Sequence, residues 1–148
     1  MSEFDFNDMN REVVAEFHAN RGVVDTAAGG YFKGKPLLLL HTTGAKTGAE
    51  RVNPLMYQDE GDRRFVFASK GGAPHNPDWY YNVKANPRVT VEMGDESYPG
   101  IATEVTGPER DRIYAAQVAT FPQFGEYEEK TTRTIPVIAL ERAEPGTA

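Results

Sequence analysis

Several features are missing from this sequence, and each absence excludes a class of protein. The chain contains no cysteine, which excludes disulfide bonds and thiolate zinc sites and agrees with a reducing compartment. Its longest aliphatic run is Leu37–Leu40, whereas a membrane-spanning helix needs about 20 apolar residues. The first residues, MSEFDFNDMNREVV, lack the basic and then apolar pattern of a signal peptide. We therefore expect a cytoplasmic protein.

An overall excess of positive charge is also missing. The formal net charge is −6, so nucleic acid, which binds basic surfaces, is not an expected partner. The cations are nevertheless unevenly placed, because residues 33–88 carry nine Lys and Arg residues against five Asp and Glu residues. A positively charged region concentrates anionic ligands, although solvated charges placed by chance account for the same pattern. Charge alone leaves both interpretations open.

The common catalytic motifs are absent as well. The stretch GGYFKGKP approaches a phosphate-binding P-loop, but Pro36 stands where that motif needs Ser or Thr. No glycine triplet matches the dinucleotide fingerprint, and there is no G-x-S-x-G nucleophile elbow. The three histidines, His18, His41 and His75, are not spaced as metal ligands. We expect neither a metal site nor a protein nucleophile.

The residues that are present predict one globular domain over residues 1–148. Links between the expected strands are too short for parallel crossovers, so the sheet should be mainly antiparallel. We predict an α+β fold, a split β-barrel over residues 36–142 with flanking helices. The expected helices are 4–20, 78–85 and 108–120, and the expected strands are 36–42, 51–58, 63–69, 88–93, 98–105 and 136–141.

The predicted N-terminal helix has an apolar stripe. Phe6, Met9, Val13 and Phe17 recur at helical spacing. Packing of this stripe on the protein's own core is the ordinary interpretation. Peripheral contact with a membrane is the alternative. No extended apolar surface is evident beyond this stripe, so we expect a monomer.

One short stretch, HTTGAKTGAERVNP, has more cations than a hairpin turn needs. Gly44 and Gly48 allow backbone N–H groups to form a nest for an anion. Lys46 adds a charge, Thr47 adds a hydroxyl, and Arg51 can donate two hydrogen bonds to a phosphate. The stretch therefore indicates a phosphate site. The alternative is that the glycines only shape the turn and the cations are solvated.

A second group of residues follows the third predicted strand. Lys70 ends that strand beside two glycines, and Trp79, Tyr80 and Tyr81 offer flat surfaces for a planar ring. Together with the glycine-rich stretch, these residues favour an anionic ligand with an aromatic head. Burial of Trp79 in the core is the competing interpretation.

Three blocks of sequence, LLLLHTTGAKTGAERVNPLMY, FVFASKGGAPHNPDWYYNVKANPRVTVE and FGEYEEKTTRTIPVIALE, resemble the deazaflavin-dependent nitroreductase family over residues 10–142. These are actinobacterial reductases that use coenzyme F-420, an 8-hydroxy-5-deazaflavin, and they include quinone reductases and nitroimidazole-activating enzymes. The resemblance implies a split barrel of the FMN-binding type. It also implies hydride transfer from the reduced cofactor to a quinone, a nitroaromatic or another planar electrophilic acceptor.

The resemblance also implies a set of cofactor contacts. Lys46, Thr47 and Arg51 should hold the cofactor phosphate. Further contacts to the ring and the tail fall on Asn53, Pro54, Leu55, Met56, Ala68, Ser69, Lys70, Trp79 and Asn82.

On the acceptor side, Tyr127 matches a substrate-facing tyrosine of the family. Ser69 and Tyr127 are the expected catalytic residues, because their hydroxyls can stabilise the oxyanion that forms on a reduced quinone. Phe124 departs from the pattern, since some relatives have a second tyrosine there. An FMN-dependent reductase and a non-catalytic protein that carries the deazaflavin or a hydrophobic ligand are the alternatives.

Overall fold

One antiparallel sheet organises the protein. The structure, a computed structural model, describes residues 6–61 and 63–143. In this part of the chain seven strands pair in the order β2-β1-β5-β6-β7-β4-β3, and every pairing is antiparallel. The strands are β1 (Leu37–Thr43), β2 (Glu50–Met56), β3 (Gln58–Glu60), β4 (Arg63–Phe67), β5 (Arg88–Met93), β6 (Glu96–Val105) and β7 (Val137–Arg142). The antiparallel α+β prediction is confirmed.

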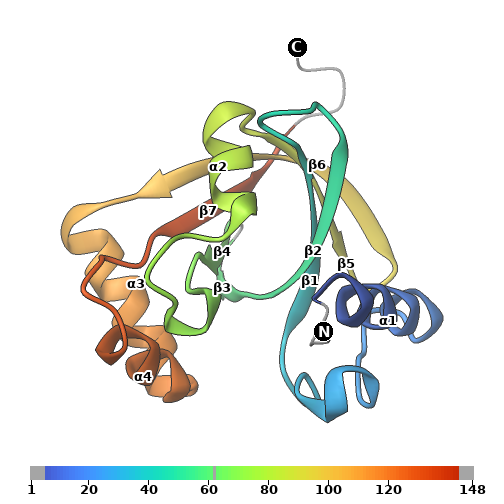
Figure 1. The fold of residues 1–148 in the computed structure, drawn as a ribbon, viewed down its shortest axis with the longest axis horizontal. Coiled ribbons are helices and arrows are strands. Elements are labelled where there is room, and N and C mark those ends of the chain that lie inside the picture. The colour runs from blue at the N-terminus through green and yellow to red at the C-terminus, as the bar shows by residue number, and fades with distance from the viewer. Residues whose placement is uncertain (1–5, 62, 144–148) are drawn as a thin grey trace.

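The sheet curls because its two edge strands are consecutive in the chain. Only Tyr57 separates β2 from β3, so the two ends of the strand order are joined directly (Figure 1). The prediction of one strand over 51–58 is therefore wrong, because the strand breaks at Tyr57 and the chain continues in β3 through Asp59 and Glu60. These two acidic residues are extended in β3, where they form ion pairs with Arg64 at 2.9 Å and Arg63 at 3.4 Å across the strand pair.

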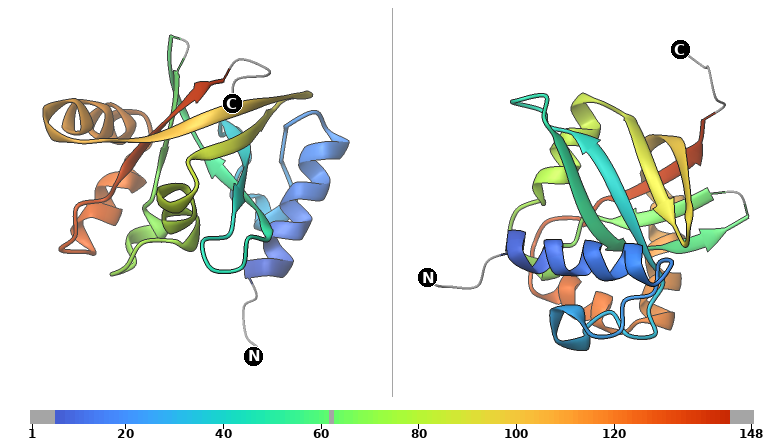
Figure 2. Two further views of the ribbon diagram at one scale, coloured as in Figure 1. Left: turned by 90° about the horizontal axis from the view of Figure 1, so that it is seen from above. Right: turned by 90° about the vertical axis from the view of Figure 1, so that its right-hand side faces the viewer.

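Helices cover the sheet at its two ends. α3 and α4 lie on one side and α1 lies on the other, as the two further views in Figure 2 show. The helices are α1 (Phe6–Ala19), α2 (Asp78–Ala85), α3 (Gly107–Thr120) and α4 (Gln123–Glu129), with short 3-10 turns η1 (Ala27–Gly30) and η2 (Lys70–Gly72).

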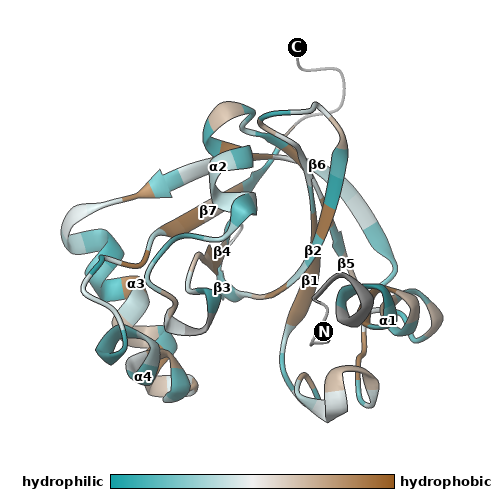
Figure 3. Ribbon diagram, viewed as in Figure 1, coloured by the Kyte–Doolittle hydropathy of each residue, from teal (hydrophilic) through white to brown (hydrophobic). Residues whose placement is uncertain are grey.

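Strand β4 separates two parts of the core. Phe65 and Phe67 pack with residues of α3 and α4, whereas Val66 and Ala68 pack with Trp79 inside the curled sheet. This is the two-faced pattern that alternation in the sequence predicts. In Figure 3 the strongly hydrophobic stretches lie mainly in strands such as β1, β4 and β7.

The apolar stripe of α1 packs on the protein's own sheet. Val13 and Phe17 are fully buried against Leu37 and Leu39 of β1, so the ordinary interpretation of this stripe is confirmed there. Residues 4–5 lie outside the described part of the chain, and the side chains of residues 6–9 are not described. None of the described helices is long and apolar enough to cross a membrane.

Candidate functional site

The turn between β1 and β2 is held in place from helix α2. Asn82 is buried, and its Oδ1 accepts a hydrogen bond from the Ala45 N–H at 2.9 Å. Its Nδ2 donates to Thr42 Oγ1 at 3.3 Å. A further hydrogen bond from the Gly44 N–H to the Ala49 carbonyl, at 2.7 Å, closes the turn. The backbone conformation is therefore set before any ligand binds.

The cations of this turn are free to meet an anion. Lys46 and Arg51 are exposed, and neither forms an ion pair or hydrogen bond with a residue of the described ranges. Thr47 Oγ1 accepts from the Ala49 N–H at 3.2 Å, so its own hydrogen remains available for donation. Gly48 has φ 73°, which a glycine adopts without strain. Two unpaired cations on a fixed turn have the chemistry of a phosphate site.

Strand β2 leads away from this turn along the edge of the sheet. Because β2 ends the strand order, part of its backbone faces away from β1 and can bond to a ligand. Pro54 fits this position, since a proline is tolerated in an edge strand. From Arg51 to Met56 the strand extends about 17 Å at about 3.3 Å per residue. Met56 at the far end is buried in the same cluster that Tyr127 packs against.

Arg133, which no sequence pattern marks as functional, organises the loop after β4. Its guanidinium donates four hydrogen bonds: Nη1 to the Ala68 carbonyl (3.2 Å) and to Asn76 Oδ1 (2.7 Å), Nη2 to the Ser69 carbonyl (2.9 Å), and Nε to the Ala73 carbonyl (3.0 Å). Asn76 followed by Pro77 is a typical helix start in sequence, but Pro77 stands at the N-cap of α2 and the Asn76 side chain accepts from Arg133. Nothing local in the sequence indicates contacts that span almost sixty or more positions.

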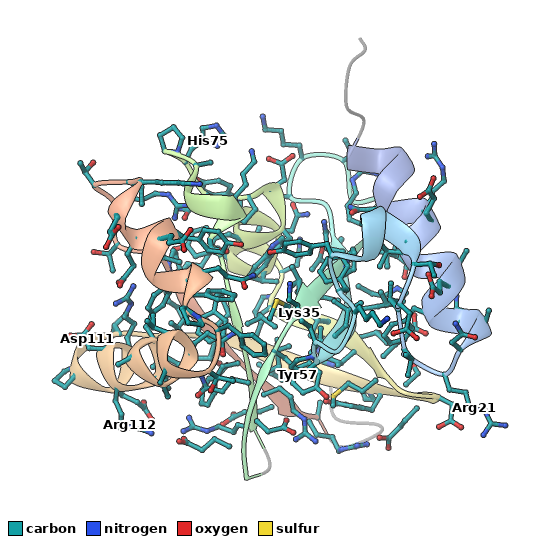
Figure 4. The ribbon with its side chains drawn as sticks, turned by 90° about the horizontal axis from the view of Figure 1, so that it is seen from below. Arg21, Lys35, Tyr57, His75, Asp111 and Arg112 are labelled. Atoms are coloured by element: carbon teal, nitrogen blue, oxygen red, sulfur yellow. The ribbon has the colours of Figure 1, made fainter. Side chains whose placement is uncertain are left out.

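Two predicted site residues, Ser69 and Lys70, lie at the start of this loop. Ser69 is nearly buried, and no residue in the described ranges hydrogen-bonds to its Oγ. Lys70 has φ 47°, a left-handed conformation that costs a non-glycine residue about 1–3 kcal/mol. Its Nζ lies 3.4 Å from Nδ1 of His75, which is labelled in Figure 4. A strained lysine beside an unpaired serine hydroxyl is typical of a ligand site.

Tyr127 joins a group of three polar side chains at this end of the molecule. Its hydroxyl oxygen lies 2.8 Å from that of Tyr31. Gln123 Nε2 donates to the Tyr31 hydroxyl at 2.8 Å and to the Tyr127 hydroxyl at 3.4 Å. Helix α4 also contacts the η2 turn closely, because a Cβ added to Gly72 would lie 2.9 Å from the Tyr127 carbonyl oxygen. The structure thus brings Tyr127 next to the Ser69–Gly72 turn.

Trp79 and Ala68 lie behind this surface. Trp79 is 4% exposed and packs inside the curled sheet, while Ala68 is fully buried there. The Ala68 N–H donates to the Pro136 carbonyl at 3.0 Å, and its carbonyl accepts from Arg133. Neither side chain is open to a ligand, so both residues support the site from within.

His18 of α1 and His41 of β1 both pair with carboxylates. Nε2 of His18 and Nε2 of His41 both contact the Glu92 carboxylate, and Nδ1 of His41 lies 3.1 Å from Glu50 Oε2. Burial acts to raise the pKa of Glu92, but the hydrogen bonds from His41 and His18 outweigh it and lower that pKa. Among the described residues no group of His, Cys, Asp and Glu could hold a metal ion. The contact with His18 ties α1 to β5.

Two surface hollows lie away from the predicted cofactor contacts. The first, about 750 Å³, is lined by residues of α1 and of the segment that follows it as far as Ala27. The second, about 220 Å³, lies between α2 and strands β6 and β7. Neither contains a residue predicted to touch the cofactor.

Comparison with known proteins assigns the chain to a family. Residues 9–142 match the family model described as F420H(2)-dependent quinone reductase. This chain belongs to that family. A protein from Mycobacterium tuberculosis (strain H37Rv), named F420H(2)-dependent quinone reductase, is 40% identical to it over 110 residues, which cover 72% of this chain and 74% of the relative.

Two solved structures are similar to this quinone reductase family member. One, described as an F420-H2 dependent reductase (FDR-A), is 46% identical, with a TM-score of 0.66, and covers 72% of this chain and 94% of its own. Another, described as a domain-swapped dimer, is 40% identical, with a TM-score of 0.68, and covers 93% of this chain and 100% of its own. The expected family, split-barrel fold, reductase class and cofactor, coenzyme F-420, are confirmed.

Proposed function

We propose that this chain transfers a hydride from reduced coenzyme F-420 to a quinone-type acceptor. The observation that carries the proposal is the arrangement of two unlike sites at opposite ends of one edge strand. The unpaired cations Lys46 and Arg51 flank the turn where β2 begins. Met56, where β2 ends, shares a core cluster with Tyr127. An elongated ligand with an anionic tail and a planar ring fits this arrangement.

The chain's residues match the chemistry of the cofactor. Lys46 and Arg51 supply charge-assisted hydrogen bonds for a phosphate, and the Thr47 hydroxyl adds a neutral donor. The outer backbone of Asn53–Met56 offers hydrogen-bonding groups along the ring edge. When bound, the reduced deazaflavin supplies the hydride, so the chain needs no nucleophile of its own.

The Ser69 and Tyr127 hydroxyls have a proposed role toward the acceptor. As an acceptor oxygen gains negative charge, a hydroxyl already held in place stabilises that charge without reorganising. Both residues meet the η2 turn, Ser69 through the chain and Tyr127 through its packing on Gly72. This shared contact supports the proposal that both residues act on one bound acceptor.

Phe124 departs from the family pattern, and the structure gives a reason for an apolar residue at this position. The Phe124 ring is 4% exposed, and its centroid lies 5.5 Å from that of Phe67 and 5.2 Å from that of Tyr127. A hydroxyl at this position would enter the apolar cluster. Acceptor binding in this chain therefore rests on Tyr127 and its polar partners.

Titration with coenzyme F-420, followed by fluorescence, tests the cofactor site. Lys46→Ala and Arg51→Ala should each weaken binding by about 1–3 kcal/mol, because each removes a charged hydrogen bond to the phosphate. Arg112→Ala makes the same change in charge on α3, away from the turn (Figure 4), and should bind as the wild type does.

Equal affinity in all three variants would refute the phosphate assignment. Parallel titrations with FMN and assays with menadione and a nitroaromatic separate the alternatives. Tight FMN binding would favour a flavin enzyme, and cofactor binding without reduction of any acceptor would favour a carrier protein.

We also propose that the chain forms a dimer, in place of the monomer expected from sequence. The support is the related structure described as a domain-swapped dimer, which matches 93% of this chain at 40% identity. Light scattering coupled to size exclusion should give twice the chain mass of 16.4 kDa. A mass of one chain across the concentration range would contradict the dimer.

A further inference from the structure

The polar group around Tyr127 includes a residue from a distant segment. Tyr31 lies in the glycine-rich segment that follows α1, 96 positions before Tyr127, and the two hydroxyl oxygens are 2.8 Å apart. Tyr31 is 45% exposed, so this contact forms at the surface rather than in the core. An exposed hydrogen bond between two hydroxyls adds little to the stability of the fold. A functional role for this contact is therefore the more informative explanation.

The segment that carries Tyr31 has an unusual backbone. Ala28, Gly29 and Gly30 have φ values of 57°, 67° and 83°, three left-handed residues in succession. For Ala28 this conformation costs about 1–3 kcal/mol, and such strain persists only where the surroundings enforce it. This backbone conformation places the next residue, Tyr31, beside Tyr127 of α4.

Other contacts enforce this path on both sides of Tyr31. Before it, the Glu16 carboxylate accepts hydrogen bonds from the backbone N–H groups of Asp25, Thr26 and Ala27 at 2.8–3.3 Å. After it, Lys35 Nζ donates to the Tyr31 carbonyl at 2.6 Å and lies 3.9 Å from the centre of the Tyr31 ring. Lys35 is labelled in Figure 4. The hydroxyl is therefore presented to Tyr127 by contacts that do not involve Tyr127.

The group formed by Tyr31, Gln123 and Tyr127 has one more hydrogen-bond donor than it uses internally. The Gln123 amide provides two N–H hydrogens, and the two tyrosines provide one O–H hydrogen each. The three hydrogen bonds within the group use three of these four hydrogens. One hydroxyl hydrogen is left without a partner in the group. Partial burial raises the pKa of Tyr31, and the hydrogen bond with Tyr127 raises it further, so this hydroxyl stays protonated.

The surroundings of the spare donor are aromatic. The Tyr127 ring contacts Phe124, and the Tyr31 ring meets Phe32 edge to face with centroids 4.9 Å apart. Phe32 and Phe121 pack against the same cluster as Tyr127. Ring edges beside one hydrogen-bond donor suit a planar molecule with a carbonyl or nitro oxygen.

We propose that Tyr31 is a positioning residue of the acceptor site, which orients the Tyr127 hydroxyl toward the oxygen of a planar acceptor. The inference rests on the proposed function, because it takes Tyr127 as the residue that meets the acceptor. It makes residues 25–36 part of the acceptor site. It also makes Tyr31 a determinant of which acceptors bind.

The test compares Tyr31→Phe, Tyr127→Phe and the double variant. Phenylalanine keeps the ring beside Phe32 and under Lys35, so only the hydroxyl is lost. Tyr31→Phe should raise the KM for menadione about 2- to 10-fold, the loss of roughly one hydrogen bond. The Kd of coenzyme F-420 and the melting temperature should not change. In the Tyr127→Phe background the same substitution should have no further effect, because its action passes through Tyr127.

Tyr98→Phe, which removes a hydroxyl from β6, is the matched control and should leave the KM for menadione unchanged. Additive effects of the two substitutions, or a parallel loss of cofactor affinity, would overturn the inference. Calorimetry of menadione binding to the complex with oxidised cofactor needs no turnover. Equal menadione affinity in wild type and Tyr31→Phe would refute the role of Tyr31, whereas a failure of the wild type to reduce any acceptor would count against the proposed function alone.

Discussion

Asn82 is predicted to contact the cofactor, but in the structure its side chain holds the β1–β2 turn. The family resemblance implies that it takes part in cofactor binding. In the structure its carboxamide is buried behind the β1–β2 turn, where it bonds to the Ala45 N–H and to Thr42 Oγ1. It therefore supports the proposed phosphate site from α2, while the cations Lys46 and Arg51 are exposed. Preorganisation of this kind raises affinity by lowering the ordering cost of binding.

This role predicts that Asn82→Ala weakens coenzyme F-420 binding although it removes no charge. The substitution leaves the Ala45 N–H without its acceptor, and such a loss costs about 1–3 kcal/mol. Fluorescence titration should show a clear drop in affinity, and urea unfolding should show lower stability. Thr42→Val removes only the weaker of the two contacts and should have a smaller effect. Cofactor affinity equal to the wild type in Asn82→Ala would show that the turn does not depend on α2.

At the scale of elements, the sequence predicts the helices and strands whose bounds depend on neighbouring residues. Helix 78–85 and strand 88–93 have the bounds that proline positions and alternation indicate. The break between β2 and β3 is missed, because the apolar pattern continues through Met56 and Tyr57 while the chain changes partner strand. That change is set by the curl of the whole sheet.

In the candidate site, too, the sequence predicts the residues that lie close together in the chain and misses those that act through distant contacts. The exposed cations and glycines of the β1–β2 turn are close in sequence, so their spacing alone indicates an anion site. Arg133 and Tyr31 act through contacts that span almost sixty to almost a hundred positions. No local period marks either residue, since one is an arginine in an irregular segment and the other a tyrosine among glycines. Both support residues that the sequence does identify, Ser69 and Tyr127.

At the scale of the molecule, α1 and residues 25–36 contact elements on opposite sides of the structure, β1 on one side and α4 on the other. Helix α1 packs on β1 through Val13 and Phe17. Residues 25–36 then connect α1 to β1, and the Tyr31 hydroxyl in this segment contacts that of Tyr127 in α4, which lies on the other side (Figure 1). Glu16 joins the helix to the start of this connection, so one carboxylate links α1 to the segment that leads to the proposed acceptor site.

Glu16 therefore predicts how stability depends on pH. Hydrogen bonds from the backbone N–H groups of Asp25 and then Ala27 lower its pKa from 4.5 to about 2. A carboxylate whose pKa is lower in the folded state stabilises that state fully above the unfolded value, and this contribution is lost as the pH falls through the folded value. The contribution of Glu16 should be complete above pH 4.5 and should disappear toward pH 2.

Urea unfolding of the wild type and Glu16→Gln across this range measures the effect. The difference in the free energy of unfolding should be constant at neutral pH and should shrink steadily as the pH falls from 4.5 toward 2. Glu12→Gln removes a carboxylate from the same helix, where no described residue bonds to it, and should differ little from the wild type. A difference for Glu16→Gln that does not change with pH would mean that the shape of the side chain, and not its charge, holds residues 25–27 against α1.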